Sequence, residues 1–80
     1  MRAVADIPHP NMKITLLAWN GKYLLKFERG DFEQTYKISE MDLEGDEEAK
    51  ALIDDDFLEA VSNRFVDMRD AFVSSLRRHI

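Results

Sequence analysis

The dipeptide Asn20-Gly21 limits the fold of this chain more than any other feature. It joins two apolar, β-rich runs, and both of its residues tolerate the positive φ that a type I′ hairpin turn requires. A two-residue turn fixes the register of its strands. The expected neighbours across the hairpin are Lys13 and Glu28, Ile14 and Phe27, Thr15 and Lys26, Leu16 and Leu25, Leu17 and Leu24, Ala18 and Tyr23, and Trp19 and Lys22.

This register divides the hairpin into an apolar face and a mixed face, because alternate side chains of a strand point to opposite sides. The apolar face, which we expect to form the core, carries Ile14, Leu16, Ala18, Tyr23, Leu25 and Phe27. The mixed face carries Lys13, Thr15, Leu17, Trp19, Lys22, Leu24, Lys26 and Glu28.

A third strand is expected over residues 32–38, after a turn at residues 28–31 that contains Gly30. Pairing Phe27 with Phe32 sets Lys26 against Glu33, whereas placing Glu28 opposite Glu33 would bring like charges together. We therefore predict the first register. The apolar face then gains Phe32, Gln34, Tyr36 and Ile38, and the mixed face gains Glu33, Thr35 and Lys37.

After this strand the apolar residues follow a helical period. Asp46 is the expected N-cap of a short helix over residues 47–53, and the three aspartates at 54–56 offer a second N-cap. Beyond them an amphipathic helix of about six turns is expected. Its apolar stripe comprises Phe57, Leu58, Val61, Phe65, Met68, Phe72, Leu76 and Ile80. One continuous helix over 47–79 is an open alternative, but aspartate caps helices well and propagates them poorly, which favours a break.

The expected fold is α+β: a three-stranded antiparallel β-meander packed on one face by a C-terminal amphipathic helix, with a short helix between (βββαα). Residues 1–11, which include Pro8 and Pro10, are interpreted as an extended N-terminal segment, and residues 12–80 as a single domain. The sequence leaves open whether residues 1–11 are ordered. A core built from 80 residues is small, and domains of this size commonly dimerise.

Residues 12–43, MKITLLAWNGKYLLKFERGDFEQTYKISEMDL, resemble the opening of short uncharacterised bacterial proteins that consist of a β-meander followed by helix. The resemblance is close over this first half of the chain and extends to the helical half only by pattern. It implies a small bacterial cytoplasmic protein. It carries no activity and no site residue.

Composition excludes several classes of function. The chain has no cysteine, which removes disulfides, thiolate metal sites and a cysteine nucleophile. Its net charge of −5 makes it a poor general nucleic-acid binder, although residues 12–38 alone are mildly basic. The N-terminus lacks the apolar core of a secretion signal, and no uncharged stretch approaches the length of about 20 residues that a membrane span needs. We expect a soluble, cytoplasmic protein.

The acidic segments have the residue types of a cation site but lack the spacing. An EF-hand loop beginning at Asp42 would need glycine where Glu47 stands and glutamate where Ile53 stands, so residues 42–48 are interpreted as a solvated turn. Capping explains the aspartates at 54–56. The two histidines, at positions 9 and 79, have no third ligand nearby in the sequence. We expect no metal site, and cation binding at the acidic segments remains a minor alternative.

Catalytic signatures are missing as well. No serine lies in a nucleophile elbow, and the glycines at 21, 30 and 45 are interpreted as turns, which leaves no phosphate-binding loop. A chain this short also has little room for a deep pocket beside its core. We therefore expect neither enzymatic activity nor a cofactor nor a small-molecule substrate.

The mixed face supplies the functional hypothesis. Leu17, Trp19 and Leu24 cluster at its Asn-Gly end, where the helix is not expected to cover them. The candidate partner-binding residues are Leu17, Trp19, Lys22, Leu24, Lys26, Thr35 and Lys37. We expect a protein-interaction module that self-associates as a homodimer or docks a partner, with Trp19 as the anchor.

Two alternatives to this interface remain at the level of sequence. The N-terminal segment or the short helix could cover the patch from within the chain. The mixed face could also bind single-stranded nucleic acid weakly, with bases stacked on Trp19 between lysines, although most aromatic residues fall on the core face. The sequence names no pathway, partner or oligomeric state.

Overall fold

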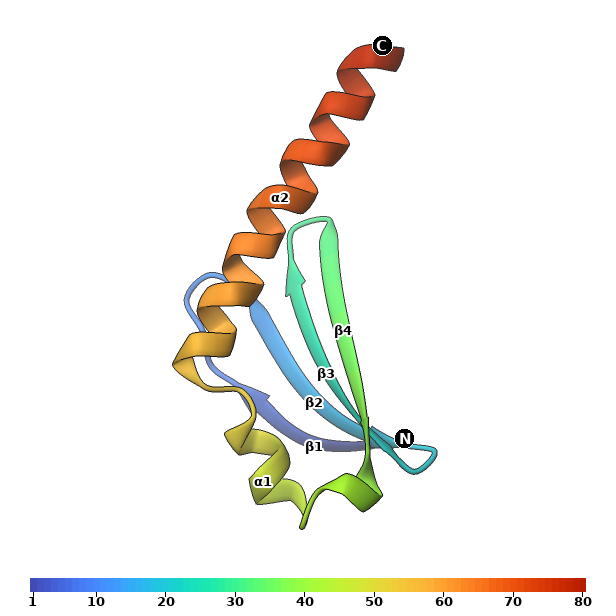
Figure 1. Ribbon diagram of the computed structural model, residues 1–80, viewed down its shortest axis with the longest axis vertical. Helices are drawn as coiled ribbons and strands as arrows, with labels where there is room; N and C mark the ends of the chain where they lie inside the picture. Colours follow the sequence, from blue (N-terminus) through green and yellow to red (C-terminus); the bar gives the residue numbers. More distant parts are fainter.

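A computed structural model describes residues 1–80 as one antiparallel sheet with helices on a single face (Figure 1). The strands β1 (Arg2–Ile7), β2 (Lys13–Trp19), β3 (Lys22–Arg29) and β4 (Phe32–Ser39) pair in chain order. A single 3₁₀ turn, η1 (Glu40–Asp42), leads to the helices α1 (Asp46–Ala51) and α2 (Asp55–His79). The α+β class and the meander are confirmed, but the sheet has four strands and not three.

The hairpin of β2 and β3 confirms the register expected from its turn. Asn20 and Gly21 have φ values of 54° and 76°, which is the pair of positive values that defines a type I′ turn. Every cross-strand pair from Lys13 with Glu28 to Trp19 with Lys22 is observed. The backbone conformation of Asn20 and Gly21 therefore determines the register of the two central strands.

The first strand was missed from the sequence, which assigned residues 1–11 to an extended segment outside the sheet. Residues 2–7 instead form β1, an edge strand antiparallel to β2 in which Ile7 pairs with Ile14. The register shifts between Ala3 and Ala5, so that Val4 occupies a bulge. Val4, Ala5 and Ile7 pack against the core, and this apolar contact explains why the segment joins the sheet.

The predicted register of the third strand was wrong. Glu28 lies opposite Glu33, and Phe27 pairs with Gln34 in place of Phe32. The observed turn is tighter than expected, with Gly30 at a φ of 57°. The like charges are tolerated because Lys26 Nζ lies 3.8 Å from an oxygen of Glu28 and 3.9 Å from an oxygen of Glu33. A shift by two positions preserves the faces, so β4 still contributes the expected side chains to each side of the sheet.

The chain forms two helices, separated at the aspartates as expected. Asp54 caps α2, where its Oδ1 accepts a hydrogen bond from the backbone N–H of Phe57 at 2.8 Å. The prediction for α1 was wrong in detail, because Gly45 occupies the N-cap position and makes no side-chain cap. Asp46 is the first residue of α1, and its carboxylate is engaged by Arg2 and Tyr23.

The core lies between the helices and one face of the sheet, which we call the core face. Its largest fully buried side chains are Ile14, Leu16, Phe27 and Val61. The Phe27 ring packs edge-on against the ring of Phe57 at a centroid distance of 5.5 Å, which joins β3 to α2. Gln34 is the one buried polar side chain, and its Nε2 donates to the carbonyl oxygen of Val61 at 2.9 Å. No helix has the length and apolar character to cross a membrane.

Candidate functional site: the open sheet face

The side of the sheet opposite the helices is uncovered along all four strands (Figure 1). The buried residues of α1 and α2, which are Ala49, Val61 and Phe65, pack against the core face. The N-terminal residues extend the sheet sideways as β1 and do not lie across it. We call this side the open face. Pairing places on it Ala3, Asp6, Lys13, Thr15, Leu17, Trp19, Lys22, Leu24, Lys26, Glu28, Glu33, Thr35 and Lys37.

All seven candidate residues from the sequence share the open face, and their pairing defines an apolar end. Leu17 and Leu24 are direct cross-strand neighbours, and Ala3 of β1 lies beside Leu17 in the same row. Trp19 lies in the adjacent row, at the Asn-Gly turn. Half of its surface, 50%, is exposed, whereas the two leucines are half-buried by their neighbours in the sheet. An indole this exposed beside aliphatic side chains has no cover within the chain.

Charges on the open face are arranged unevenly along the strands. Glu28 and Glu33 lie at the end away from Trp19 and share Lys26 between them. Lys22 and Lys37 lie in the rows of Trp19 and Leu24, and neither forms an ion pair. The apolar end is therefore bordered by uncompensated positive charge. A complementary surface would be acidic as well as apolar.

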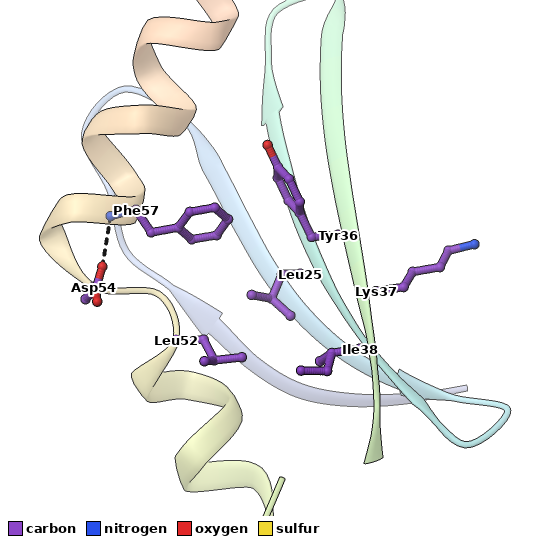
Figure 2. A pocket seen from close by; sticks show the side chains of 7 residues that line it. All are labelled: Leu25, Tyr36, Lys37, Ile38, Leu52, Asp54 and Phe57. Atoms are coloured by element: carbon purple, nitrogen blue, oxygen red, sulfur yellow. Dashed lines mark hydrogen bonds between the residues drawn. The ribbon is translucent and has the colours of Figure 1, made fainter. Parts of the chain in front are cut away.

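A cavity of about 330 Å³ lies on the core face between the sheet and the start of α2. Figure 2 shows its apolar walls, made by Leu25, Tyr36, Ile38, Leu52 and Phe57. Its two polar residues do not converge on the space: Asp54 is engaged as the α2 cap, and Lys37 points away toward the other side of the sheet (Figure 2). The volume is at the small end for ligand pockets, and the third polar group of the lining, the Tyr36 hydroxyl, donates to Gln34 Oε1 at 2.6 Å.

A polar cluster that the sequence did not reveal joins β1, β3 and α1. Tyr23 Oη donates to Asp46 Oδ1 at 2.7 Å, and the Arg2 guanidinium donates to both oxygens of the same carboxylate at 2.9 Å and 3.2 Å. These bonds, from Arg2 first and then from Tyr23, lower the pKa of Asp46 to about 2. The same contacts raise the pKa values of Arg2 and Tyr23 above their usual ranges.

This cluster is structural in character. A carboxylate with a pKa of about 2 is a very weak base at neutral pH and is unsuited to proton abstraction. Its three members are distant in the sequence, so no spacing signal could have identified them. No cluster of three or more potential ligands from His, Cys, Asp and Glu is positioned to hold a metal ion.

No protein family, curated protein or solved structure was found to match this chain. The resemblance of residues 12–43 to short bacterial proteins accordingly stays an expectation. The open face is the candidate site that the geometry supports best.

Proposed function

We propose that this chain is a small non-enzymatic protein-interaction module that docks a partner on its open face. The observation that carries the proposal is the position of Trp19, which is 50% exposed beside Leu17 and Leu24 on a face that no other segment covers. Tryptophan gives large contact area at little entropic cost and is the residue type most enriched at binding hot spots.

Charge and area indicate the kind of partner. Lys22 and Lys37 are unpaired beside the apolar end, so a partner that presents an acidic rim around an apolar anchor is favoured over one that is basic. Four strands about 4.8 Å apart and about seven residues long give the face a footprint of roughly 440 Å². The footprint is a planar area, and it describes one small docking patch when set beside the ~800 Å² of accessible surface that each partner buries in a standard complex.

The test compares Trp19→Ala with Val66→Ala as a matched control, because Val66 is a 46% exposed apolar side chain on α2, which packs on the opposite side of the sheet. Partners captured by the wild-type chain are identified, and the dissociation constant of each is measured with the three chains. Loss of the tryptophan anchor is expected to weaken binding by about 30-fold or more, and the control to leave it unchanged. If Trp19→Ala changes neither the captured set nor the dissociation constant, the open face is not the docking surface.

A second candidate function, weak binding of single-stranded nucleic acid, is supported by the presence of Trp19 on the same face as Lys22 and Lys37, neither of which forms an ion pair. It is disfavoured by the position of the other aromatic residues, since Tyr23 and Phe27 are buried on the core face. Titration with oligonucleotides at low salt separates the candidates. Stacking would quench Trp19 fluorescence with a salt-dependent affinity, and an unchanged signal would remove this function.

A further inference from the structure

Strand β4 is an edge of the sheet, and its outer side has no partner. It is bonded only to β3, and no helix or strand runs along its other side (Figure 1). Because Arg29 and Phe32 flank a two-residue turn, they form a hydrogen-bonded pair, and the backbone groups of β4 point alternately toward β3 and outward from there. The N–H and C=O groups of Glu33, Thr35 and Lys37 therefore point outward. No backbone hydrogen bond outside the β3–β4 ladder uses them.

The opposite edge of the sheet is built differently. Strand β1 has a bulge at Val4 and is followed closely by Pro8 and Pro10, and both features disrupt pairing at an edge. Strand β4 pairs with β3 without a bulge over its whole length and contains no proline. Its protection is charge, because Glu33 and Lys37 are exposed along it. A strand that pairs with β4 must therefore neutralise both charges.

The sequence of β4 is complementary to itself when it is reversed. Glu33 and Lys37 lie two positions before and two positions after Thr35. In an antiparallel pair of β4 strands centred on Thr35, Glu33 of each copy lies opposite Lys37 of the other. The two Thr35 side chains are then direct neighbours, and both kinds of pair stabilise adjacent strands. Lys37 forms no ion pair within the chain, so the second copy supplies the one that it lacks.

The same pairing is complementary on the core face. It sets Phe32 of each copy opposite Ile38 of the other, and an aromatic residue opposite a β-branched one is a favourable cross-strand pair. Both side chains are only half-buried in the single chain. Ile38 and Tyr36 line the cavity of about 330 Å³ (Figure 2). The Phe32 ring of the second copy would therefore lie at the β4 border of that cavity.

We propose that two copies of this chain pair through their β4 edges, about a two-fold axis at Thr35, to form one continuous antiparallel sheet. The outward backbone groups of Glu33, Thr35 and Lys37 all fall in hydrogen-bonded pairs in this register, which gives about six backbone hydrogen bonds. The axis is perpendicular to the sheet, so the helices of both copies lie on one side and both open faces on the other. The contact leaves the open face free and is independent of the proposed function.

Charge selects this register among the symmetric ones. An axis at Glu33 or at Lys37 would set like charges directly opposite each other. An axis at Tyr36 would set Lys37 opposite Thr35 and leave Glu33 without a cation. An axis at Gln34 would set Glu33 opposite Thr35 and shorten the paired segment. Only the axis at Thr35 pairs both charges within the strand.

The experiment is sedimentation equilibrium of the full chain from micromolar to millimolar concentration, where we expect a monomer–dimer equilibrium. Glu33→Lys and Lys37→Glu each set like charges opposite each other at two symmetric positions, and each is expected to raise the dissociation constant by about tenfold or more. The double variant that combines the two changes exchanges the charges and is expected to restore the dimer. Lys22→Glu matches the change in net charge on the inner strand β3 and is expected to leave the dimer unchanged.

Hydrogen exchange locates the contact. The amide protons of Glu33, Thr35 and Lys37 are expected to exchange freely at micromolar concentration and to gain protection at millimolar concentration, because they enter hydrogen bonds only in the dimer. Trp19→Ala is expected to leave both the mass and this protection unchanged, which separates the dimer from docking on the open face. Far-UV circular dichroism verifies that each variant is folded.

Three results would overturn the proposal. A chain that stays monomeric over the whole range leaves the β4 edge to a strand of another protein. A dimer that both single reversals leave intact, or that the double variant fails to restore, has a different contact. A dimer in which the amides of Glu33, Thr35 and Lys37 stay unprotected does not form through β4.

Discussion

A change of one atom at Gln34 is expected to have a large effect on the free energy of unfolding. It is buried on β4, where its Nε2 donates to the Val61 carbonyl oxygen of α2 at 2.9 Å. Its Oε1 accepts from Tyr36 Oη at 2.6 Å. Gln34→Glu preserves the shape of the side chain but replaces the donor NH₂ with an acceptor oxygen that faces another acceptor.

The expected cost follows from these contacts. Losing the bond to Val61 costs about 1 kcal/mol, and burying a carboxylate without a donor at that position adds about 1–3 kcal/mol. The total of about 2–4 kcal/mol is a large part of the free energy of unfolding, which is about 4–12 kcal/mol for 80 residues at the usual stability per residue. Gln34→Met, which has a similar volume and no acceptor oxygen, removes both hydrogen bonds without adding a charge. Its expected cost of about 1–2 kcal/mol is therefore smaller.

The dependence on pH makes the prediction specific. Burial raises the pKa of the introduced carboxyl in the folded state above the value of about 4.3 in the unfolded chain. The deficit of Gln34→Glu is therefore complete above the folded pKa and shrinks as the pH falls toward about 4.3, because the protonated acid can donate to Val61 again. Asp46, whose folded pKa is about 2, is common to all the chains compared, so its own titration cancels in the differences between them.

Urea unfolding followed by circular dichroism, for both variants and the wild-type chain at several pH values between 4 and 8, measures the differences. The reasoning is refuted if Gln34→Glu costs no more than Gln34→Met at pH 7. It is refuted equally if the deficit of the glutamate variant does not shrink on acidification.

Two further changes probe the polar contacts of the helices. Asp46 has a folded pKa of about 2, below its usual 3.8, so its contribution to stability is complete above pH 3.8 and is lost as the pH falls toward 2. Asp46→Asn is therefore expected to make the free energy of unfolding less dependent on pH across this window. Identical acid titrations of the variant and the wild-type chain would contradict this. Asp54→Ala removes the capping hydrogen bond that Asp54 Oδ1 accepts from the Phe57 N–H, and it is expected to lower the free energy of unfolding by about 1 kcal/mol, measured by urea titration. Asp55→Ala, which removes a neighbouring aspartate that is not the cap, is the control.

The parts of the fold that sequence reasoning recovered depend on short-range chemistry. The positive φ values at Asn20 and Gly21 determine the β2–β3 register, and Asp54 determines where α2 begins. Strand β1 could not be found in this way. Its residues have a bulge at Val4 that breaks the alternation of side chains, and its apolar contacts are made only with the assembled core.

The other two errors, in the β3–β4 register and in the cap of α1, share one physical cause, which is the neglect of a third partner. Repulsion between Glu28 and Glu33 was weighed without Lys26, which lies close to both carboxylates. Asp46 was assigned as a cap because its engagement by Arg2 is invisible in the sequence. Pairwise rules applied to neighbours in sequence omit such long-range contacts.

The residues of the candidate site were predictable because strand parity fixes their face. The parity held even where the β3–β4 register was wrong, so Thr35 and Lys37 stayed with Leu17 and Trp19. The exposure of Trp19 was not predictable. It depends on where the N-terminal residues and α1 pack, and both lie away from the open face.

The order of the sheet has a consequence for how this protein opens. Every strand is bonded to its neighbour in the chain, and no backbone hydrogen bond joins α2 to a strand. The bond from Gln34 to Val61 is the one hydrogen bond between α2 and the sheet; the remaining attachment is apolar packing. Helix α2 can therefore detach as a cooperative unit while the strands stay paired, and amide protons of β2 and β3 should exchange with solvent more slowly than those of α2.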